Sequence, residues 1–286
     1  MLCFFASDLH GHEDRYRKLI GAVEAGRPAA VFLGGDLLPS ALLGRPGAGR
    51  RGSDFISGFL GRELSGLRER LGPAYPRVFA ILGNDDPRAE EAAVLDLARA
   101  GLCEYIHQRQ VAFRAWMVHG YACVPPTPFR LKDWECYDVS RYVDPGCLPP
   151  EEGVRTVPVD RRAVVQRTIA DDLRALAGEA DQAGAIWLFH TPPYQTTLDR
   201  AALDGRAVDH APLDVHVGSV AVRRFIEARQ PAVTLHGHIH ESARLSGAWQ
   251  DRIGRTVMLS AAHDGPELAL VRFDPAAPAD AFRDLI

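Results

Sequence analysis

The sequence predicts an α/β fold, because short apolar runs that are typical of buried strands alternate with stretches of helical periodicity. Glycine or a polar side chain follows almost every run. In an open α/β sheet, sites form where the chain leaves the carboxyl ends of the strands. The polar residues in question extend from residue 8 to residue 240, so one site draws on most of the chain. We therefore expect a single domain over residues 1–286.

The first apolar run, Leu2–Ala6, is followed by Asp8 and His10. These two side chains stand two positions apart and point the same way in an extended backbone. Later runs end in the same manner. Asp36 comes after the run Ala29–Leu33, and Asn84, Asp85 and Asp86 come after the run Val78–Leu82. His190 comes after the run Ala185–Phe189, and His238 and His240 come after the run Ala232–Leu235. Imidazole, carboxylate and amide groups are thus expected to converge, without a thiolate among them.

Helices are expected between these strands, and most have recognisable ends. Over Glu13–Ala25 apolar residues recur at helical spacing, and Gly26 ends the helix. Asp86 followed by Pro87 is typical of an N-cap that opens a helix to Ala100. Further helices are expected over Asp54–Leu71, over Arg161–Ala177 capped by Asp160, and from Ser219 to Arg229, and further strands over Val111–Phe113, Trp116–His119, Ala243–Leu245, Val257–Ser260 and Leu268–Phe273.

Two long connections, at about 120–159 and 191–218, show no clear periodicity. Loops of this length are uncommon in a compact domain and are usually functional, so we expect both to form the rim of the site. A third loop covers Leu37–Gly52, and its residues 47–52 match G-x-G-x-x-G. The strand, turn and helix that a dinucleotide site requires are missing there. The loop's arginines could clamp a phosphate or be solvated; they are Arg45, Arg50 and Arg51.

Composition limits the partners of the protein. A net charge of −4 with 24% charged residues argues against a broad electrostatic surface for long nucleic acids. The five cysteines include no C-x-x-C pair and are odd in number, which suits reduced thiols and a cytoplasmic location better than a disulfide framework. The first apolar run stops at Asp8, so we expect no signal peptide. No run approaches the roughly 20 apolar residues that a membrane span needs.

The residues at the strand ends have the chemistry of a site for two divalent metal ions that share one carboxylate. Mixed imidazole and oxygen ligands suit Mn, Fe, Zn or similar ions, and the lack of cysteine disfavours a structural zinc site. Two such ions about 3.5–4 Å apart bind both oxygens of an in-line phosphoryl displacement and make hydroxide from a bridging water near neutral pH. This chemistry is phosphoester hydrolysis. The expected ligands are Asp8, His10, Asp36, Asn84, His190, His238 and His240.

The order of these motifs resembles the calcineurin-like metallophosphoesterase superfamily. The match comprises Asp8-x-His10, Gly35-Asp36, Gly83-Asn84, His190 and Gly237-His238-x-His240. The resemblance implies one metal on Asp8, His10 and His240, a second on Asn84, His190 and His238, and Asp36 as the bridge between them. It also implies a four-layer α/β/β/α sandwich, in which helices flank two mixed β-sheets. The segments His190-Thr191-Pro192-Pro193 and His216-Val217-Gly218-Ser219 resemble a cytosolic bacterial and archaeal branch of phosphodiesterase-like members.

One position departs from the family pattern. Many members carry, after the motif asparagine, a histidine that protonates the leaving oxygen, and here that residue is Asp85. Carboxylic acids, with ordinary pKa values of about 4, are poor proton donors at neutral pH. Either its surroundings make Asp85 a donor, or His119 or His216 replaces it, or the leaving group needs little help. The last option favours phosphodiesters with acidic leaving groups over alkyl monoesters.

The candidate site residues and the function also have alternative interpretations. Asp36 and Asn84 each follow a glycine and could simply form turns. Asn84, His119 and His216 are also candidates for substrate contacts, although His216 suits a solvated loop equally well. A non-catalytic protein-binding scaffold with a decayed site is the alternative to a hydrolase, and the complete ligand set argues against decay. Within the class of small phosphorylated molecules, the sequence leaves the substrate open, as it does the metal and the oligomeric state.

Overall fold

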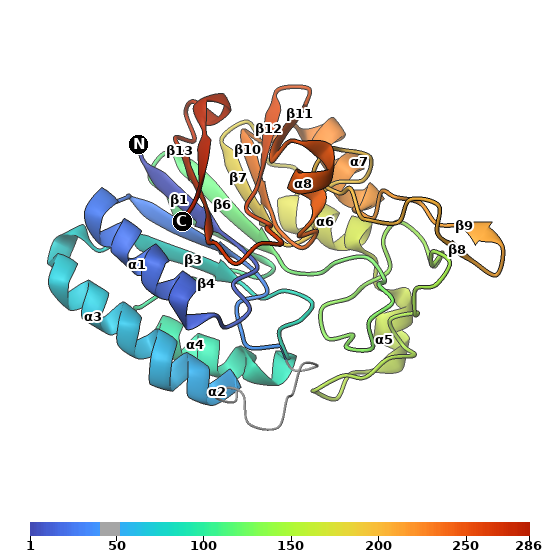
Figure 1. Cartoon of the computed structure of the whole chain (residues 1–286), viewed down its shortest axis with the longest axis horizontal. Helices are drawn as coiled ribbons and strands as arrows, with labels where there is room; N and C mark the ends of the chain where they lie inside the picture. Colours follow the sequence, from blue (N-terminus) through green and yellow to red (C-terminus); the bar gives the residue numbers. More distant parts are fainter. Residues whose placement is uncertain (41–51) are drawn as a thin grey trace.

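The computed structural model describes residues 1–40 and 52–286 (Figure 1). The arginines at 45, 50 and 51, with most of the G-x-G-x-x-G match, lie outside these ranges. Within them, the strands form two six-stranded mixed sheets, and helices cover both outer faces. The predicted four-layer α/β/β/α sandwich is therefore confirmed.

The first sheet combines strands from the amino-terminal part of the chain with strands from its end. Its order is β14 (Phe282–Leu285), β13 (Ala269–Phe273), β1 (Cys3–Ala6), β2 (Ala30–Gly34), β3 (Arg77–Ile81) and β4 (Glu104–Tyr105). Strands β1, β2 and β3 run parallel, with Phe5 beside Phe32 and Phe32 beside Phe79. Strand β13 runs antiparallel to β1. The three parallel strands consequently end at the same edge of the sheet.

The second sheet is built around four parallel strands with an antiparallel strand at each edge. Its order is β11 (Gln250–Ile253), β12 (Thr256–Ser260), β10 (Val233–His236), β7 (Ala185–Phe189), β6 (Trp116–Tyr121) and β5 (Arg109–Phe113). Strand β10 runs parallel to both β7 and β12, and β6 runs parallel to β7. The ends of β7 and β10 therefore also share one edge.

The helices divide between the two outer faces (Figure 1). Helices α1 (Glu13–Gly26), α3 (Gly61–Leu71) and α4 (Glu91–Arg99) lie along the first sheet, and α6 (Ile169–Ala177) and α7 (Val220–Arg229) cover the second. The other helical segments are α2 (Gly52–Phe55), a π-helical turn at Ile56–Leu60, α5 (Arg161–Gln166), α8 (Ser242–Ser246), and 3-10 turns at Gly72–Ala74, Arg88–Glu90 and Pro278–Asp280. Helix α1 buries the residues expected from its periodicity, Tyr16, Leu19, Ile20 and Val23.

Strand β7 shows how the layers are held together. Its residues are fully buried and alternate between two apolar clusters. Ile186 and Leu188 belong to the cluster that includes the first sheet, whereas Trp187 packs beneath the helices, 4.5 Å from the ring of Phe225 in α7. Burying side chains of this size stabilises the fold by roughly 2–3 kcal/mol each. A strand packed on both faces gives a rigid support for the residue that follows it.

Some local predictions are wrong. Ala243–Leu245 was expected to be a strand but lies in helix α8, which Gly247 caps with a φ of 78°. The prediction failed because so short an apolar run does not distinguish a helix from a strand. The helix expected over residues 161–177 is two helices, α5 and α6, separated by the extended residue Arg167. Thr168 caps the second of them, since its side chain accepts a hydrogen bond from the backbone N–H of Asp171. Strands β4, β11 and β14, and the two short strands within the second long connection, were not predicted.

The first long connection is irregular from residue 122 to residue 160. Isolated bridges, between Val124 and Glu135 and between Leu131 and Val154, fold it against itself. The second connection contains only the small hairpin of β8 (Ala207–Val208) and β9 (Ala211–Pro212). Both project on the same side of the molecule (Figure 1). In the part of the chain that the structure describes, no helix has the length and apolar character needed to cross a bilayer.

Candidate metal centre

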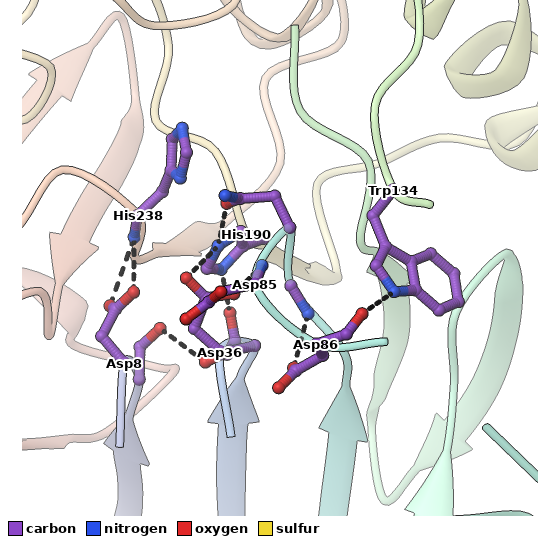
Figure 2. A network of polar contacts seen from close by, with 12 residues as sticks. Asp8, Asp36, Asp85, Asp86, Trp134, His190 and His238 are labelled. Carbon is purple, nitrogen blue, oxygen red and sulfur yellow. Dashed lines mark hydrogen bonds and ion pairs between the residues drawn. The ribbon is translucent and has the colours of Figure 1, made fainter. Parts of the chain in front are cut away.

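The two sheets present their strand ends to each other, and the motif residues meet there (Figure 2). Asp8 and His10 follow β1, and Asp36 follows β2. Asn84 and Asp85 follow β3, the next strand of the same sheet. The second sheet contributes His190 after β7, and His238 and His240 after β10. Side chains as much as 232 positions apart in the sequence (8 to 240) thus share one site.

The first group of potential ligands comprises Asp8, His10, Asp36 and His240, whose ligand atoms all lie within 4.8 Å of one another. His240 Nε2 is 3.3 Å from Asp8 Oδ1 and 3.2 Å from His10 Nε2. His10 Nε2 in turn lies 3.9 Å from Asp36 Oδ2. Two imidazoles and two carboxylates therefore direct nitrogen and oxygen lone pairs at a common point.

The second group comprises Asp36, His190 and His238, again with ligand atoms within 4.8 Å of one another. His190 Nε2 is 3.4 Å from Asp36 Oδ2 and 3.0 Å from Asn84 Oδ1. Asp36 belongs to both groups. The shared carboxylate is the arrangement expected of a bridging ligand between two cations.

Several of these residues hold a backbone conformation that is uncommon for residues with a side chain. Asp8, His10, Asp36 and His238 have positive φ angles of 57°, 45°, 50° and 74°. A left-handed conformation costs such residues of order 1 kcal/mol or more and persists only where the surroundings enforce it. The strand ends therefore turn sharply to direct these side chains into the site.

The glycines of the motifs allow the loops to approach one another. A Cβ atom on Gly83 would lie 2.3 Å from Asp36 Oδ1, and one on Gly237 would lie 2.0 Å from Ser7 Oγ. Both separations are far below van der Waals contact. Glycine before the ligand is thus required by close packing between the loops at the strand ends.

Charge and burial set the protonation of the cluster. Burial opposes the charge of Asp36, yet His190 and His10 hold the pKa of its carboxyl well below the usual value. Burial also opposes the charge of His10 and His190, but neighbouring carboxylates, Asp85 for the first and Asp36 for the second, raise the pKa of each to about 9. Burial and His190 lower the pKa of His238 to about 3, so its imidazole is neutral at physiological pH.

His190 and His10, whose pKa values are raised to about 9, are each oriented through Nδ1. His190 Nδ1 lies 2.8 Å from the carbonyl oxygen of Gly34, and His10 Nδ1 lies 3.2 Å from Asp85 Oδ2. Metal-binding histidines commonly donate one ring N–H in this way, which leaves the other nitrogen for the metal. Ser40 Oγ donates to the second carboxylate oxygen of Asp85 at 2.9 Å. The position that carries a proton donor in the family pattern is therefore engaged in holding His10.

Asp86 was expected to cap a helix, and the structure corrects that prediction. A 3-10 turn separates it from α4, and its fully buried carboxylate accepts hydrogen bonds from the backbone N–H groups of Leu37, Leu38 and Gly83. Burial raises the pKa of Asp86 to about 7. Trp134, from the first rim segment, donates Nε1 to the carbonyl oxygen of Asp86 at 2.8 Å (Figure 2). Asp86 thus joins the loops that carry Asp36 and Asn84.

The remaining candidates occupy different surroundings. His119 is buried in β6 and stacks on Trp187 at 4.3 Å, which places its ring on the helix-covered face of the second sheet rather than at the strand ends. Burial lowers its pKa to about 4. His216 lies in the second rim segment, half-buried, with Nδ1 2.8 Å from Asp199 Oδ1. Asp199 is fully buried and fixes this ring.

Sequence reasoning missed the supporting roles of Asp86, Ser40 and Trp134. The three consecutive polar residues Asn84, Asp85 and Asp86 could have indicated such roles, because a turn after a buried strand needs only one turn-forming residue. Ser40 and Trp134 gave no such signal, since their partners are distant in the sequence.

The profile of the calcineurin-like phosphoesterase family matches residues 1–242. The chain belongs to the calcineurin-like phosphoesterase family. Members of this family are phosphoesterases that use divalent metals, and the clustered Asp and His side chains provide ligands for such metals. No curated protein matches the sequence.

Solved structures share the fold of this phosphoesterase. One crystal structure aligns over 99% of this chain and 98% of the other with a TM-score of 0.61 and 16% identity. TT1561 of Thermus thermophilus aligns over 99% and 98% with a TM-score of 0.54 and 17% identity. A dimetal phosphatase from Danio rerio aligns over 95% and 91% with a TM-score of 0.49 and 13% identity. At such low identity the two likenesses with TM-scores above 0.5 show the fold alone.

Proposed function

We propose that this protein hydrolyses small phosphoesters at a dinuclear metal site, with diesters favoured over monoesters. The observation that supports the proposal most strongly is that Asp36 belongs to both groups of potential ligands. Asp8, His10 and His240 would hold one divalent ion, and Asn84, His190 and His238 the other. The donor set of imidazole, carboxylate and amide fits Mn, Fe, Zn or similar ions. We also propose that residues 1–286 form a single domain.

When bound, two divalent ions lower the pKa of a water molecule and neutralise charge on the phosphoryl oxygens. The residues of the chain supply the geometry for this. Gly34 and Asp85 fix the rings of His190 and His10 with Nε2 toward Asp36. The amide oxygen of Asn84 lies 3.0 Å from His190 Nε2, as expected of a second ligand to the same ion. Its amide nitrogen is expected to contact the substrate.

The preference for diesters is inferred from Asp85. Its carboxylate faces His10, so we assign it a positioning role instead of proton donation. We retain His216 as a substrate contact and candidate proton donor, because Asp199 orients its ring beside the loop that follows His190. His119 is left out of the proposed proton donors and substrate contacts because its ring lies against Trp187. A substrate with an acidic leaving group depends least on a proton donor.

Hydrolysis of an aryl phosphodiester in the presence of Mn²⁺ tests the proposal. The parent protein is expected to turn over the diester and to lose activity with EDTA. Asp36→Ala is expected to be inactive, whereas Asp96→Asn, which changes an exposed carboxylate on α4, is expected to match the parent. A metal-loaded parent protein that is inactive on diesters and monoesters with every divalent ion would favour the protein-binding scaffold.

The environment of the cysteines supports a cytoplasmic location for the enzyme. Cys3, Cys103, Cys123, Cys136 and Cys147 are all free thiols. Reduced thiols are usual in the cytosol. We propose this location together with a small phosphorylated substrate, because the net charge of −4 argues against a broad electrostatic surface for long nucleic acids.

A further inference from the structure

A second cluster of reactive side chains lies where the first rim segment meets α6. Cys123 lies just beyond β6, and Cys136 is beside it because its backbone N–H donates to the carbonyl oxygen of Val124 at 3.1 Å. The sulfur atoms of the two cysteines and a carboxylate oxygen of Asp172 all lie within 4.8 Å of one another. Both cysteines are buried.

A guanidinium group completes the cluster. Arg167 Nη2 lies 3.6 Å from Cys123 Sγ and 2.7 Å from Asp172 Oδ2. The hydroxyl of Tyr121 also donates to Asp172 Oδ2 at 2.7 Å. The side chain of Arg167 is 30% exposed, so the cluster borders the protein surface. Arginine beside a sulfur atom stabilises the thiolate, which is the reactive form of cysteine.

The two cysteines are consequently unequal. Contact with Cys136, together with the charge of Arg167, lowers the pKa of Cys123 to about 7 despite burial. The pKa of Cys136 is raised by the same contact and by burial. Burial raises the pKa of Cys3 to about 12, and the other cysteines outside this cluster are shifted in the same direction. One thiol of the pair is thus activated while its neighbour stays protonated.

We propose that Cys123 and Cys136 form a reversible disulfide when hydrogen peroxide oxidises the protein. The Cys123 thiolate attacks one peroxide oxygen, the O–O bond breaks, and sulfenic acid and water result once the leaving oxygen takes a proton. The thiol of Cys136 then attacks the sulfenic sulfur, forms the S–S bond and releases a second water. Two thiols lose two electrons in total, and one peroxide is reduced to two waters.

The geometry favours this chemistry over a third metal site. Two thiols and a carboxylate are possible zinc ligands. The guanidinium of Arg167, however, already contacts both the sulfur of Cys123 and the carboxylate of Asp172, in the place that a cation would take. Bond formation needs the sulfur atoms to close to about 2.05 Å, a movement within an irregular segment that carries no strand or helix.

Peptide mapping under non-reducing conditions tests the proposal. The full-length protein is reduced, freed of reductant and treated with a small excess of hydrogen peroxide. We expect a linked pair of peptides containing Cys123 and Cys136 that is two hydrogens lighter and reverts with dithiothreitol. Cys3, Cys103 and Cys147 serve as internal controls that stay reduced. Cys147→Ala is the matched variant and should form the same link.

Two further variants keep the test decisive if one of them fails to fold. Arg167→Met should slow oxidation of Cys123 about tenfold or more, because it removes the charge that stabilises the thiolate. Cys136→Ala should accumulate sulfenic acid at Cys123, which dimedone traps. Cys123 that stays reduced, Cys123 that is overoxidised while Cys136 remains a free thiol, or zinc that co-purifies and is lost in Cys123→Ser would each overturn the proposal.

Discussion

Replacing Asp85 by Asn separates a positioning role from proton donation. Asp85 Oδ2 lies 3.2 Å from His10 Nδ1, so the carboxylate can accept the Nδ1–H of the neutral ring and leave Nε2 for the metal. Asp8 and Asp36 also face His10, and asparagine can still accept the hydrogen bond. We therefore expect a net loss of about 1.4–2.7 kcal/mol, or 10–100-fold in metal affinity.

The assay compares two aryl phosphodiesters, one with 4-nitrophenyl and one with unsubstituted phenyl as the leaving group, over a range of Mn²⁺ concentrations. A positioning role predicts that Asp85→Asn raises the Mn²⁺ concentration for half-maximal rate and slows both substrates by the same factor. Ser40→Ala, which removes the partner of the other carboxylate oxygen, should act in the same direction but more weakly. A loss confined to the phenyl ester at unchanged Mn²⁺ requirement would exclude the positioning role and make Asp85 the proton donor.

Other consequences can be measured separately. Calorimetric titration with Mn²⁺ in buffers of different ionisation enthalpy should show at least two protons released at pH 7, because His10 and His190, with pKa values of about 9, must lose their protons to bind; release should fall by about two above that pKa, and none at pH 7 would contradict the assignment. Asp86→Ala should lower the free energy of unfolding in urea by about 2–4 kcal/mol, because buried N–H groups lose their acceptor, and a change near zero would contradict its structural role. His216→Ala should reduce kcat/KM about tenfold or more at unchanged Mn²⁺ requirement, whereas weakened metal binding would exclude a role at the rim.

The strand-end ligands could be predicted from the sequence because the signal is local. An apolar run followed at once by Asp or His, as at Leu2–Ala6 and Asp8, marks both the strand and the point where its side chains leave the sheet. Parallel pairing then brings Asp8 and Asp36 to one edge without further information. The sheets contribute from opposite sides; the repeated pattern of a strand followed by a ligand suggested that His190 and His238 would meet them there, and the motif resemblance implied that both hold the same metal.

The supporting contacts could not be predicted in the same way, because they depend on tertiary packing. Asp86 and Pro87 have the local pattern of a helix start, but backbone N–H groups from the loop after β2 compete for the carboxylate. Likewise, nothing in the local sequence pairs Asp85 with His10, which is 75 positions away. The short run Ala243–Leu245 shows a related limit, since it lies in a five-residue helix that Gly247 caps.

An anomalous-scattering map from a crystal soaked in Mn²⁺ would locate the two metal positions. Two peaks about 3.5–4 Å apart are expected on either side of the Asp36 carboxylate, with His10 and His240 nearest one and His190 and His238 nearest the other. Peaks remote from Asp36, or a fully loaded protein with a single peak that these histidines do not contact, would contradict the proposed dinuclear site.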